Sequence, residues 1–338
     1  MASLDLNYPA RLPLAQTPTP LQLLSRISAE YGGSHRIWVK RDDLTGAALS
    51  GNKLRKLEFI TALAREQGCD TLITCGGVQS NHCRATALVG AQLGFRVHLI
   101  LRGEAPAEID GNLLLDHLAG ANISHYPPKQ YVNELDALFE HWEHHYREQG
   151  GKAWSMPTGA SDGVGIWGYI AGAEELGADL AAEGIESAHV VCATGSGGTQ
   201  AGLTLGAALH GLELDVWGIN VCDDEAWFLN KVDEDIADWH RRYCPAAALP
   251  DYTARVIDGY VGPGYGRADP EIFETIAIAA RMEGLVLDPV YTGKAFHGLL
   301  EQIRQGRFDD RRDIVFVHTG GIYGLFPQRG GFAQATQA

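Results

Sequence analysis

A lysine beside a glycine-asparagine turn is the residue of this chain best suited to do chemistry. Lys53 lies in the run 49–58, Leu-Ser-Gly-Asn-Lys-Leu-Arg-Lys-Leu-Glu, where the apolar spacing of a helix begins. The partial positive charge at a helix N-terminus favours a neutral amine, and a neutral amine can condense with an aldehyde. Most lysines beside a glycine are hydrated surface residues, so Lys53 alone carries little weight.

A glycine-rich turn between a predicted strand and a predicted helix is the second candidate. The run 194–202 reads Thr-Gly-Ser-Gly-Gly-Thr-Gln-Ala-Gly. Its glycines and hydroxyls could direct consecutive backbone N–H groups onto one phosphate, with the helix N-terminus behind them. Gln200 breaks the dinucleotide fingerprint and no G-K-[ST] follows, which disfavours nucleotide binding. A tight turn that needs glycine only for packing is the alternative.

A polar run before another predicted helix is the third candidate. Gln79-Ser80-Asn81-His82 follows a buried strand, and Ser80 or Asn81 could be the N-cap of the helix. The same helix start could instead hold a carboxylate or a phenolate, and the residues alone favour neither interpretation. An activatable lysine, a phosphate-binding turn and an anion-binding loop together meet the needs of a pyridoxal phosphate enzyme.

Composition restricts the class of protein. The chain has 338 residues, which suggests about two domains. Its 27 basic and 42 acidic residues give a net charge of −15, which argues against nucleic acid or an anionic membrane as a partner. Six cysteines show neither a C-x-x-C pair nor zinc spacing, so we predict no metal. The N-terminus lacks the features of a signal peptide, and we expect a cytoplasmic protein.

Short apolar runs alternate with helical patterns along most of the chain. The strands expected from these runs are 36–40, 71–75, 97–101, 123–126, 188–193, 216–221 and 313–318. Helices are expected between them, among them 81–93 and 133–149. Such alternation predicts an α/β fold with parallel sheets covered by helices on both faces.

Taken together, these segments resemble those of a known family. The chain is similar to the tryptophan-synthase-β-like group (fold type II) of pyridoxal phosphate enzymes, and within it to the D-cysteine desulfhydrase and 1-aminocyclopropane-1-carboxylate (ACC) deaminase family. The resemblance covers about residues 12–326. It rests on the runs 40–43 (Lys-Arg-Asp-Asp), 51–58, 79–82, 195–199, 262–266 (Gly-Pro-Gly-Tyr-Gly), 287–294 (Leu-Asp-Pro-Val-Tyr-Thr-Gly-Lys) and 318–321 (His-Thr-Gly-Gly).

The resemblance implies an architecture of two parallel-sheet, three-layer domains with the cofactor between them. Residues 1–50 and 161–338 would form a large cofactor-binding domain, and residues 51–160 a small domain. It also implies a homodimer that acts on a small amino acid.

The resemblance further implies roles for individual residues. Lys53 would bind the cofactor covalently and later move a proton at the substrate Cα, and Thr319 would face the pyridine nitrogen. The residues assigned to the cofactor are Lys53, Asn81, Gly195, Ser196, Gly197, Gly198, Thr199 and Thr319. Those assigned to the substrate are Gln79, Ser80, Asn81, Tyr265 and Tyr291. Those assigned to catalysis are Lys53, Ser80, Tyr265 and Tyr291.

A threonine at the pyridine nitrogen has a chemical consequence. The Thr319 hydroxyl would leave that nitrogen largely unprotonated, whereas a carboxylate would keep it protonated. The ring would then withdraw less charge, and prompt loss of a β substituent would compete well with transamination.

The pattern therefore favours α,β-elimination from a β-substituted alanine, with D-cysteine converted to pyruvate, hydrogen sulfide and ammonia as the first choice. ACC deaminases carry Glu and Leu at the positions of Thr292 and Thr319, so ring opening to 2-oxobutyrate is less favoured. Departures at Asp162, Trp167, Ile322 and Tyr323 leave an L-cysteate sulfo-lyase open. A nucleotide-dependent oxidoreductase and a non-catalytic ligand-binding module are the remote alternatives.

Overall fold

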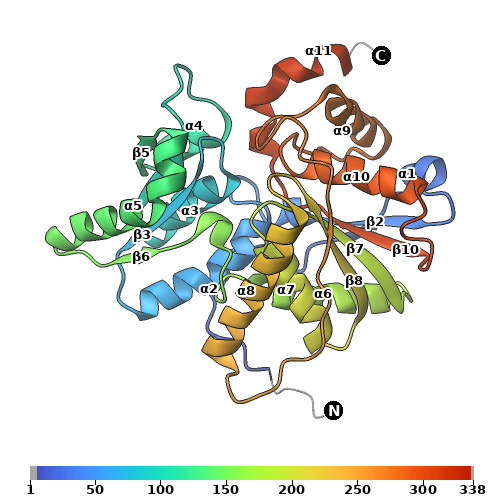
Figure 1. The fold of residues 1–338 in the computed structure, drawn as a ribbon, viewed down its shortest axis with the longest axis horizontal. Coiled ribbons are helices and arrows are strands. Elements are labelled where there is room, and N and C mark those ends of the chain that lie inside the picture. Colours follow the sequence, from blue (N-terminus) through green and yellow to red (C-terminus); the bar gives the residue numbers. More distant parts are fainter. Residues whose placement is uncertain (1–5, 336–338) are drawn as a thin grey trace.

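The chain folds around two separate β-sheets that lie side by side (Figure 1). The computed structural model describes residues 6–335. The larger sheet has six strands in the order β1-β2-β10-β7-β8-β9, and all neighbours are parallel except the edge pair β1 and β2. Its strands are β1 (Leu21–Leu23), β2 (Arg36–Lys40), β7 (Ser187–Thr194), β8 (Glu213–Asn220), β9 (Arg255–Ile257) and β10 (Asp313–Val317).

The smaller sheet has four strands in the order β5-β4-β3-β6, all parallel. They are β3 (Thr71–Gly77), β4 (Arg96–Arg102), β5 (Asn122–Tyr126) and β6 (Ala153–Ser155). The strands of the two sheets fall on opposite sides of the predicted domain division. The division at residues 50 and 160 itself stays a prediction.

Helices flank both sheets (Figure 1). Those nearest the smaller sheet are α2 (Asn52–Glu66), α3 (Asn81–Leu93), α4 (Gly111–Leu118) and α5 (Pro128–Glu148). The remaining α-helices are α1 (Ser25–Tyr31), α6 (Trp167–Ala182), α7 (Gly198–Leu209), α8 (Glu225–Tyr243), α9 (Pro270–Glu283), α10 (Thr292–Arg304) and α11 (Phe332–Ala335). In the described range, no helix combines the length and the apolarity needed to cross a bilayer.

The close packing of α6 against α7 fixes where the glycine-rich turn lies. A Cβ atom at Gly202 would lie 2.5 Å from Cβ of Tyr169, and one at Gly206 would lie 2.6 Å from Cβ of Ala173. Glycine at both positions lets the two helix backbones approach. The start of α7, directly after β7, is therefore held at the carboxyl edge of the larger sheet.

The predicted strands and the helix 81–93 are confirmed, with ends that differ by at most a few residues. Helix α5 begins at Pro128, five positions before the predicted start, because a proline is well tolerated in the first turn of a helix. Strands β1, β6 and β9 were not predicted. Each has only three residues, which is too short for a periodic pattern.

Candidate active site

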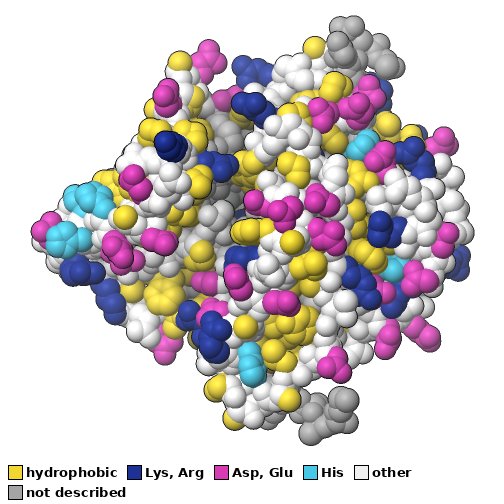
Figure 2. Space-filling view, in the orientation of Figure 1, with side chains coloured by type: hydrophobic (Ala, Val, Ile, Leu, Met, Phe, Trp, Pro, Cys, Tyr) yellow, Lys and Arg dark blue, Asp and Glu magenta, His cyan; other side chains and the backbone are white. Residues whose placement is uncertain are grey.

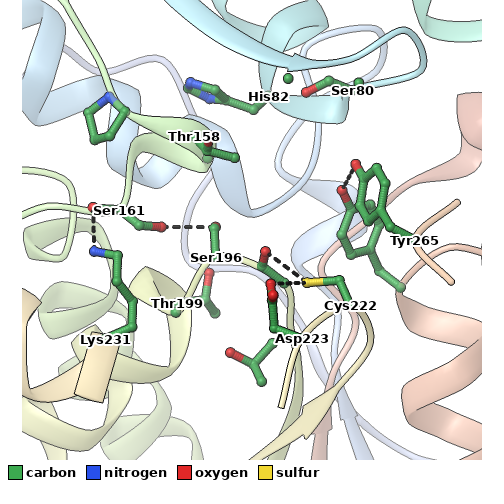
Figure 3. A pocket seen from close by; sticks show the side chains of 18 of the residues that line it. Ser80, His82, Thr158, Ser161, Ser196, Thr199, Cys222, Asp223, Lys231 and Tyr265 are labelled. Atoms are coloured by element: carbon green, nitrogen blue, oxygen red, sulfur yellow. Dashed lines mark hydrogen bonds between the residues drawn. The ribbon is translucent and has the colours of Figure 1, made fainter. Parts of the chain in front are cut away.

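A cavity of about 460 Å³ lies between the two sheets and is lined by loops from both (Figure 3). Figure 2 shows the surface hollowed between the part that carries α5 and the part that carries α8, with acidic and basic side chains interspersed. Ligands of parallel α/β sheets bind outside the carboxyl ends of the strands. The predicted site residues that line the cavity are Lys53, Ser80, Gly195, Ser196, Gly197, Thr199, Tyr265, Tyr291 and Thr319.

Lys53 stands in the first turn of α2, held there by a close backbone contact. Gly51, before the helix, has a φ of 93°, and a Cβ atom there would lie 2.7 Å from the Thr319 carbonyl oxygen. The Asn52 N–H donates to that same oxygen at 3.1 Å. The Lys53 Nζ lies 3.5 Å from the Gly159 carbonyl oxygen. Burial lowers the pKa of the Lys53 ammonium to about 8, so a usable fraction of the amine is neutral near physiological pH.

A second lysine lies one helical turn further along α2, and it is fully buried. The Lys56 Nζ donates to the Gly159 carbonyl oxygen at 3.1 Å and to the Ser161 Oγ at 3.3 Å. Burial holds the pKa of Lys56 well below its usual range, and the charge of Lys53 lowers it further. Lys56 does not line the cavity; it fixes the segment 159–161 against the glycine-rich turn.

Ser161 joins that segment to the turn. Its hydroxyl accepts from the Gly198 N–H at 3.1 Å and donates to the Ser196 Oγ at 2.9 Å (Figure 3). Its carbonyl oxygen accepts from the Lys231 Nζ at 3.0 Å. The Lys231 ammonium is in turn paired with Asp235. The turn is therefore held from outside before any ligand is considered.

The glycine-rich turn itself has the shape of an anion cradle. Gly197 has a φ of 83° and precedes α7, and because it has no side chain it cannot cap the helix. The Thr199 hydroxyl accepts from the Asn52 Nδ2 at 2.9 Å. A Cβ atom at Gly195 would lie 2.9 Å from the Tyr291 ring, and one at Gly159 would lie 2.3 Å from the Ser196 Oγ. Gly198 is one of the predicted phosphate-binding residues, but its N–H already donates to the Ser161 hydroxyl.

The start of α3 supplies a second helix N-terminus to the cavity. Ser80 is the N-cap and accepts from the Cys83 N–H at 3.2 Å. His82 lies beside it (Figure 3), with its Nε2 2.8 Å from the Thr74 Oγ1. Burial holds the pKa of His82 well below its usual value, so the ring is neutral. Within the described residues, its Nδ1 has no hydrogen-bond partner, and the same is true of the Thr194 Oγ1; both residues line the cavity.

Two of the predicted substrate-binding residues, Gln79 and Asn81, form hydrogen bonds with the segment 110–112. The Gln79 amide donates to the Asp110 carbonyl oxygen and accepts from the Asn112 N–H, each at 2.9 Å. The Asn81 Oδ1 accepts from the Asn112 Nδ2 at 2.9 Å. Neither residue lines the cavity. Gln79 therefore holds the start of α4 against the segment before α3. The geometry does not support direct contact of Gln79 with a substrate.

A tyrosine pair also lines the cavity. The hydroxyls of Tyr265 and Tyr291 are 2.5 Å apart. Burial raises the pKa of Tyr265 to about 12, and burial together with Tyr265 raises the pKa of Tyr291 well above its usual value. Both phenols are therefore protonated at neutral pH. Asp288 orients the loop before α10 by accepting from the N–H groups of Val290 and Tyr291, at 2.8 and 3.0 Å.

Several residues that line the cavity were not predicted from the sequence. They are Asn52, His82, Arg102, Tyr131, Ser161, Cys222, Asp223, Trp227 and Lys231. Cys222 and Asp223 come two and three positions after the end of β8, and polar residues after a parallel strand are a signal that could have identified them. The residues of α5 and α8 reach the cavity only through the way those helices pack, which no local pattern reports.

The residues present fit a cofactor that carries an aldehyde and a phosphate. Lys53 offers an amine with a lowered pKa, and the start of α7 offers a cradle that larger residues at Gly195 or Gly159 would fill. The Thr194 and His82 side chains supply buried polar atoms without a partner in the part of the chain that the structure describes. Buried polar atoms of this kind call for a ligand or water.

Comparisons with known proteins agree with this chemistry. A Thermotoga maritima protein with a provisional ACC deaminase name is 40% identical over 319 residues, covering 94% of this chain and 98% of that protein. A D-cysteine desulfhydrase of Yersinia pestis is 38% identical over 330 residues, covering 94% and 95%. The crystal structure of an ACC deaminase homologue superposes with a TM-score of 0.87 at 33% identity, covering 96% of each chain.

The family described as "Pyridoxal-phosphate dependent enzyme" matches residues 12–320, which include every segment that lines the cavity. The expected fold type II architecture and the expected cofactor are thereby confirmed. Three observations agree: a lysine stands at the start of a helix, an anion cradle faces it, and similar proteins match nearly the whole chain. This chain belongs to the pyridoxal-phosphate dependent enzyme family.

Proposed function

We propose that this enzyme catalyses α,β-elimination from a β-substituted alanine, with D-cysteine as the first substrate to test. The overall reaction consumes one water and converts D-cysteine to pyruvate, hydrogen sulfide and ammonia. The observation that carries the proposal is that Lys53, with its pKa lowered to about 8, shares one cavity with an anion cradle and a second helix N-terminus. The name of the Yersinia pestis relative supports the choice of D-cysteine.

Pyridoxal phosphate supplies an aldehyde that condenses with amines and a ring that withdraws electrons from the substrate Cα. The glycine-rich turn and the start of α7 would hold its phosphate, and Lys53 would bind it. The N–H groups at the start of α3, with Ser80, would hold the substrate carboxylate. Neutral Lys53 would then take the proton from Cα, because its lowered pKa makes it a competent base near physiological pH.

The tyrosine pair would act at the β position. Tyr265 and Tyr291 share one hydrogen bond, so one of the two hydroxyl protons is free to point into the cavity. A protonated phenol can donate to a leaving group that gains negative charge. The raised pKa values keep both phenols protonated, which suits a hydrogen-bond donor and argues against a phenolate base.

Replacement of Lys53 tests the proposal. Lys53→Ala should abolish both the visible absorbance of the bound cofactor and pyruvate release from D-cysteine. Lys129→Ala, an exposed lysine on α5 outside the cavity, is the control and should change neither. Pyruvate release by Lys53→Ala at the rate of the unmodified enzyme would refute the proposal.

Ring opening of ACC is the second candidate, supported by the names of two of the similar proteins. The cavity favours it less. Thr292 is buried, bonds to Asp288 at 2.7 Å and does not line the cavity, and Thr319 is a threonine rather than a leucine. Parallel assays for pyruvate with D-cysteine and for 2-oxobutyrate with ACC separate the two activities. We propose a cytoplasmic homodimer, which light scattering and cell fractionation would test.

A further inference from the structure

Arg102 is a cation in the cavity that forms no ion pair with any carboxylate of residues 6–335. It is the last residue of β4, and its guanidinium lies 5.1 Å from the Tyr265 ring centre and 5.8 Å from that of Tyr131. Within the described residues, it makes no ion pair and no side-chain hydrogen bond. Its five N–H donors are therefore available on the substrate side of the cavity.

Two other arginines show that the guanidinium groups of this fold are not generally left without hydrogen-bond partners. Arg96, at the other end of β4, also stacks on a tyrosine, with 5.2 Å to the Tyr146 ring centre, but it is paired with Asp70 at 3.0 Å. Arg84 is buried and donates to Asn112 and to two backbone carbonyl oxygens. Leaving a half-buried guanidinium unpaired costs free energy, and a ligand anion would recover that cost.

The carboxylates nearest to the cavity do not serve as partners of Arg102. Asp136 on α5 and Asp223 after β8 line the cavity, but both are exposed at its rim and neither forms an ion pair with Arg102. The Asp223 carboxylate instead accepts from the Cys222 thiol at 3.4 Å. Lys231, the other cation near the rim, is paired with Asp235.

In the proposed function, the start of α3 would bind the substrate carboxylate. Arg102 lies close to the start of α3, because Gly77 at the end of β3 pairs with Arg102 in the sheet register. Tyr265 packs over Gly77, where a Cβ atom would lie 3.2 Å from the ring. Arg102 thus stacks on a tyrosine of the pair that would act at the β position.

We propose that Arg102 is a specificity-determining residue that binds an anionic β substituent of the amino-acid substrate, so that the enzyme accepts alanines substituted with a sulfonate. The inference rests on the proposed β-elimination and names its substrate class. With cysteate, the Cα–H and Cβ–S bonds break, and the C–S electron pair leaves with sulfite. Cysteate and water give pyruvate, bisulfite and ammonium, which balances atoms and charge.

Two substrates with different charge test the role of Arg102. Pyruvate release is measured for both enantiomers of cysteate, which is charged at the β position, and of β-chloroalanine, which is not. Arg102→Met should raise KM for cysteate about 30-fold, the value of a lost charge-assisted hydrogen bond, and change KM for β-chloroalanine less than about threefold. Arg102→Lys should recover part of the loss. Arg96→Met is the matched control, with both substrates unaffected.

Other outcomes would overturn the inference. An equal loss for both substrates would mean that Arg102 binds the α-carboxylate. Pyruvate from β-chloroalanine but not from either enantiomer of cysteate would reject the substrate class and leave the proposed elimination intact. No pyruvate from cysteate, from β-chloroalanine or from D-cysteine would reject both the proposed elimination and the role of Arg102.

A test on the unmodified enzyme does not depend on the folding of a variant. Homocysteate and methionine sulfone are similar in size, but only homocysteate is anionic at its end. We expect homocysteate to inhibit β-chloroalanine turnover about tenfold more strongly. Equal inhibition by the two compounds would contradict an anion site at Arg102.

Discussion

The two sides of the cavity differ in how their polar groups are satisfied. On the side of the larger sheet, Ser161 bonds to Gly198 and Ser196, and Lys56 and Lys231 bond to the segment 159–161. On the side of the smaller sheet, the Arg102 guanidinium stacks on the rings of Tyr131 and Tyr265 and forms no ion pair within the described part of the chain. On the larger-sheet side, which would hold the cofactor, side chains of the protein already fix the glycine-rich turn, although the Thr194 Oγ1 is left without a partner among the described residues. On the smaller-sheet side, which would meet the substrate, the donors of Arg102 are left for a ligand to bind.

The largest effect should come from filling the cradle on the cofactor side. Gly159→Ala would place a Cβ atom 2.3 Å from the Ser196 Oγ and 3.1 Å from the Lys53 Nζ, at a residue with a φ of 67°. We expect the affinity for pyridoxal phosphate to fall about 100-fold, measured by absorbance titration of the apoprotein. Gly68→Ala is the control, because Gly68 has a similar φ of 70° but no atom within 4 Å of its Cβ position. Similar losses in the two variants would show that backbone strain, not the cradle, is responsible.

The pH dependence of cofactor capture tests whether Lys53 is as desolvated as its position indicates. Burial lowers its pKa to about 8, so the neutral, reactive fraction grows as pH rises and saturates above that value. The rate of capture by the apoprotein should rise about tenfold between about pH 7 and pH 9 and then level off. Stopped-flow absorbance measures this rate. A rate that keeps rising beyond about pH 10 would indicate an ordinary, solvated lysine.

Removing the Ser161 hydroxyl should separate the two sides. Ser161→Ala removes an acceptor for Gly198 and Lys56 and a donor to Ser196. We expect about a fivefold loss of cofactor affinity and little change in the ratio of KM for cysteate to KM for β-chloroalanine. Arg102→Met should show the opposite pattern, with cofactor affinity kept and that ratio changed. If each variant altered both quantities equally, the two sides would not be independent.

The smallest effect concerns the group that faces the pyridine nitrogen in the proposed arrangement. Thr319→Asp should raise the share of turnovers that end in transamination, because a carboxylate would keep that nitrogen protonated. We expect this share to reach a few per cent, detected by chromatography of the cofactor forms after extended turnover. Thr319→Ser keeps a hydroxyl and should match the unmodified enzyme. An unchanged product partition in Thr319→Asp would count against a contact between residue 319 and the nitrogen.

Much of the architecture could be predicted because it depends on local patterns. The helix 81–93 was predicted to the residue, because it has a capping serine before it and a glycine in the left-handed region after it. The continuous apolar run of β7 reports a strand buried on both faces. Edge strand β1 could not be predicted, because three residues with a largely exposed pattern carry no period.

The candidate site was predicted only where residues belong to motifs. Lys53, Ser80 and the glycine-rich turn each stand where a strand or loop meets a helix, a place that the sequence marks. Arg102 ends an ordinary strand, and Tyr131 lies on an amphipathic helix that starts earlier than its pattern suggested. Nothing local to either residue indicates a cavity.

The sequence by itself determined which groups are available: a lysine at a helix start, an uncapped turn of glycines and hydroxyls, and a serine that caps a helix. Helix starts, turns and caps depend on residues only a few positions apart, because the hydrogen bonds that form them join neighbouring residues of the chain. Only the tertiary structure decided which groups remain unsatisfied. Ser161 meets Gly198 and Lys56 across more than thirty positions, and Arg102 pairs with no carboxylate of residues 6–335. Desolvation and pairing depend on neighbours brought together by packing, so the lowered pKa of Lys53 and the free guanidinium of Arg102 are properties of the fold.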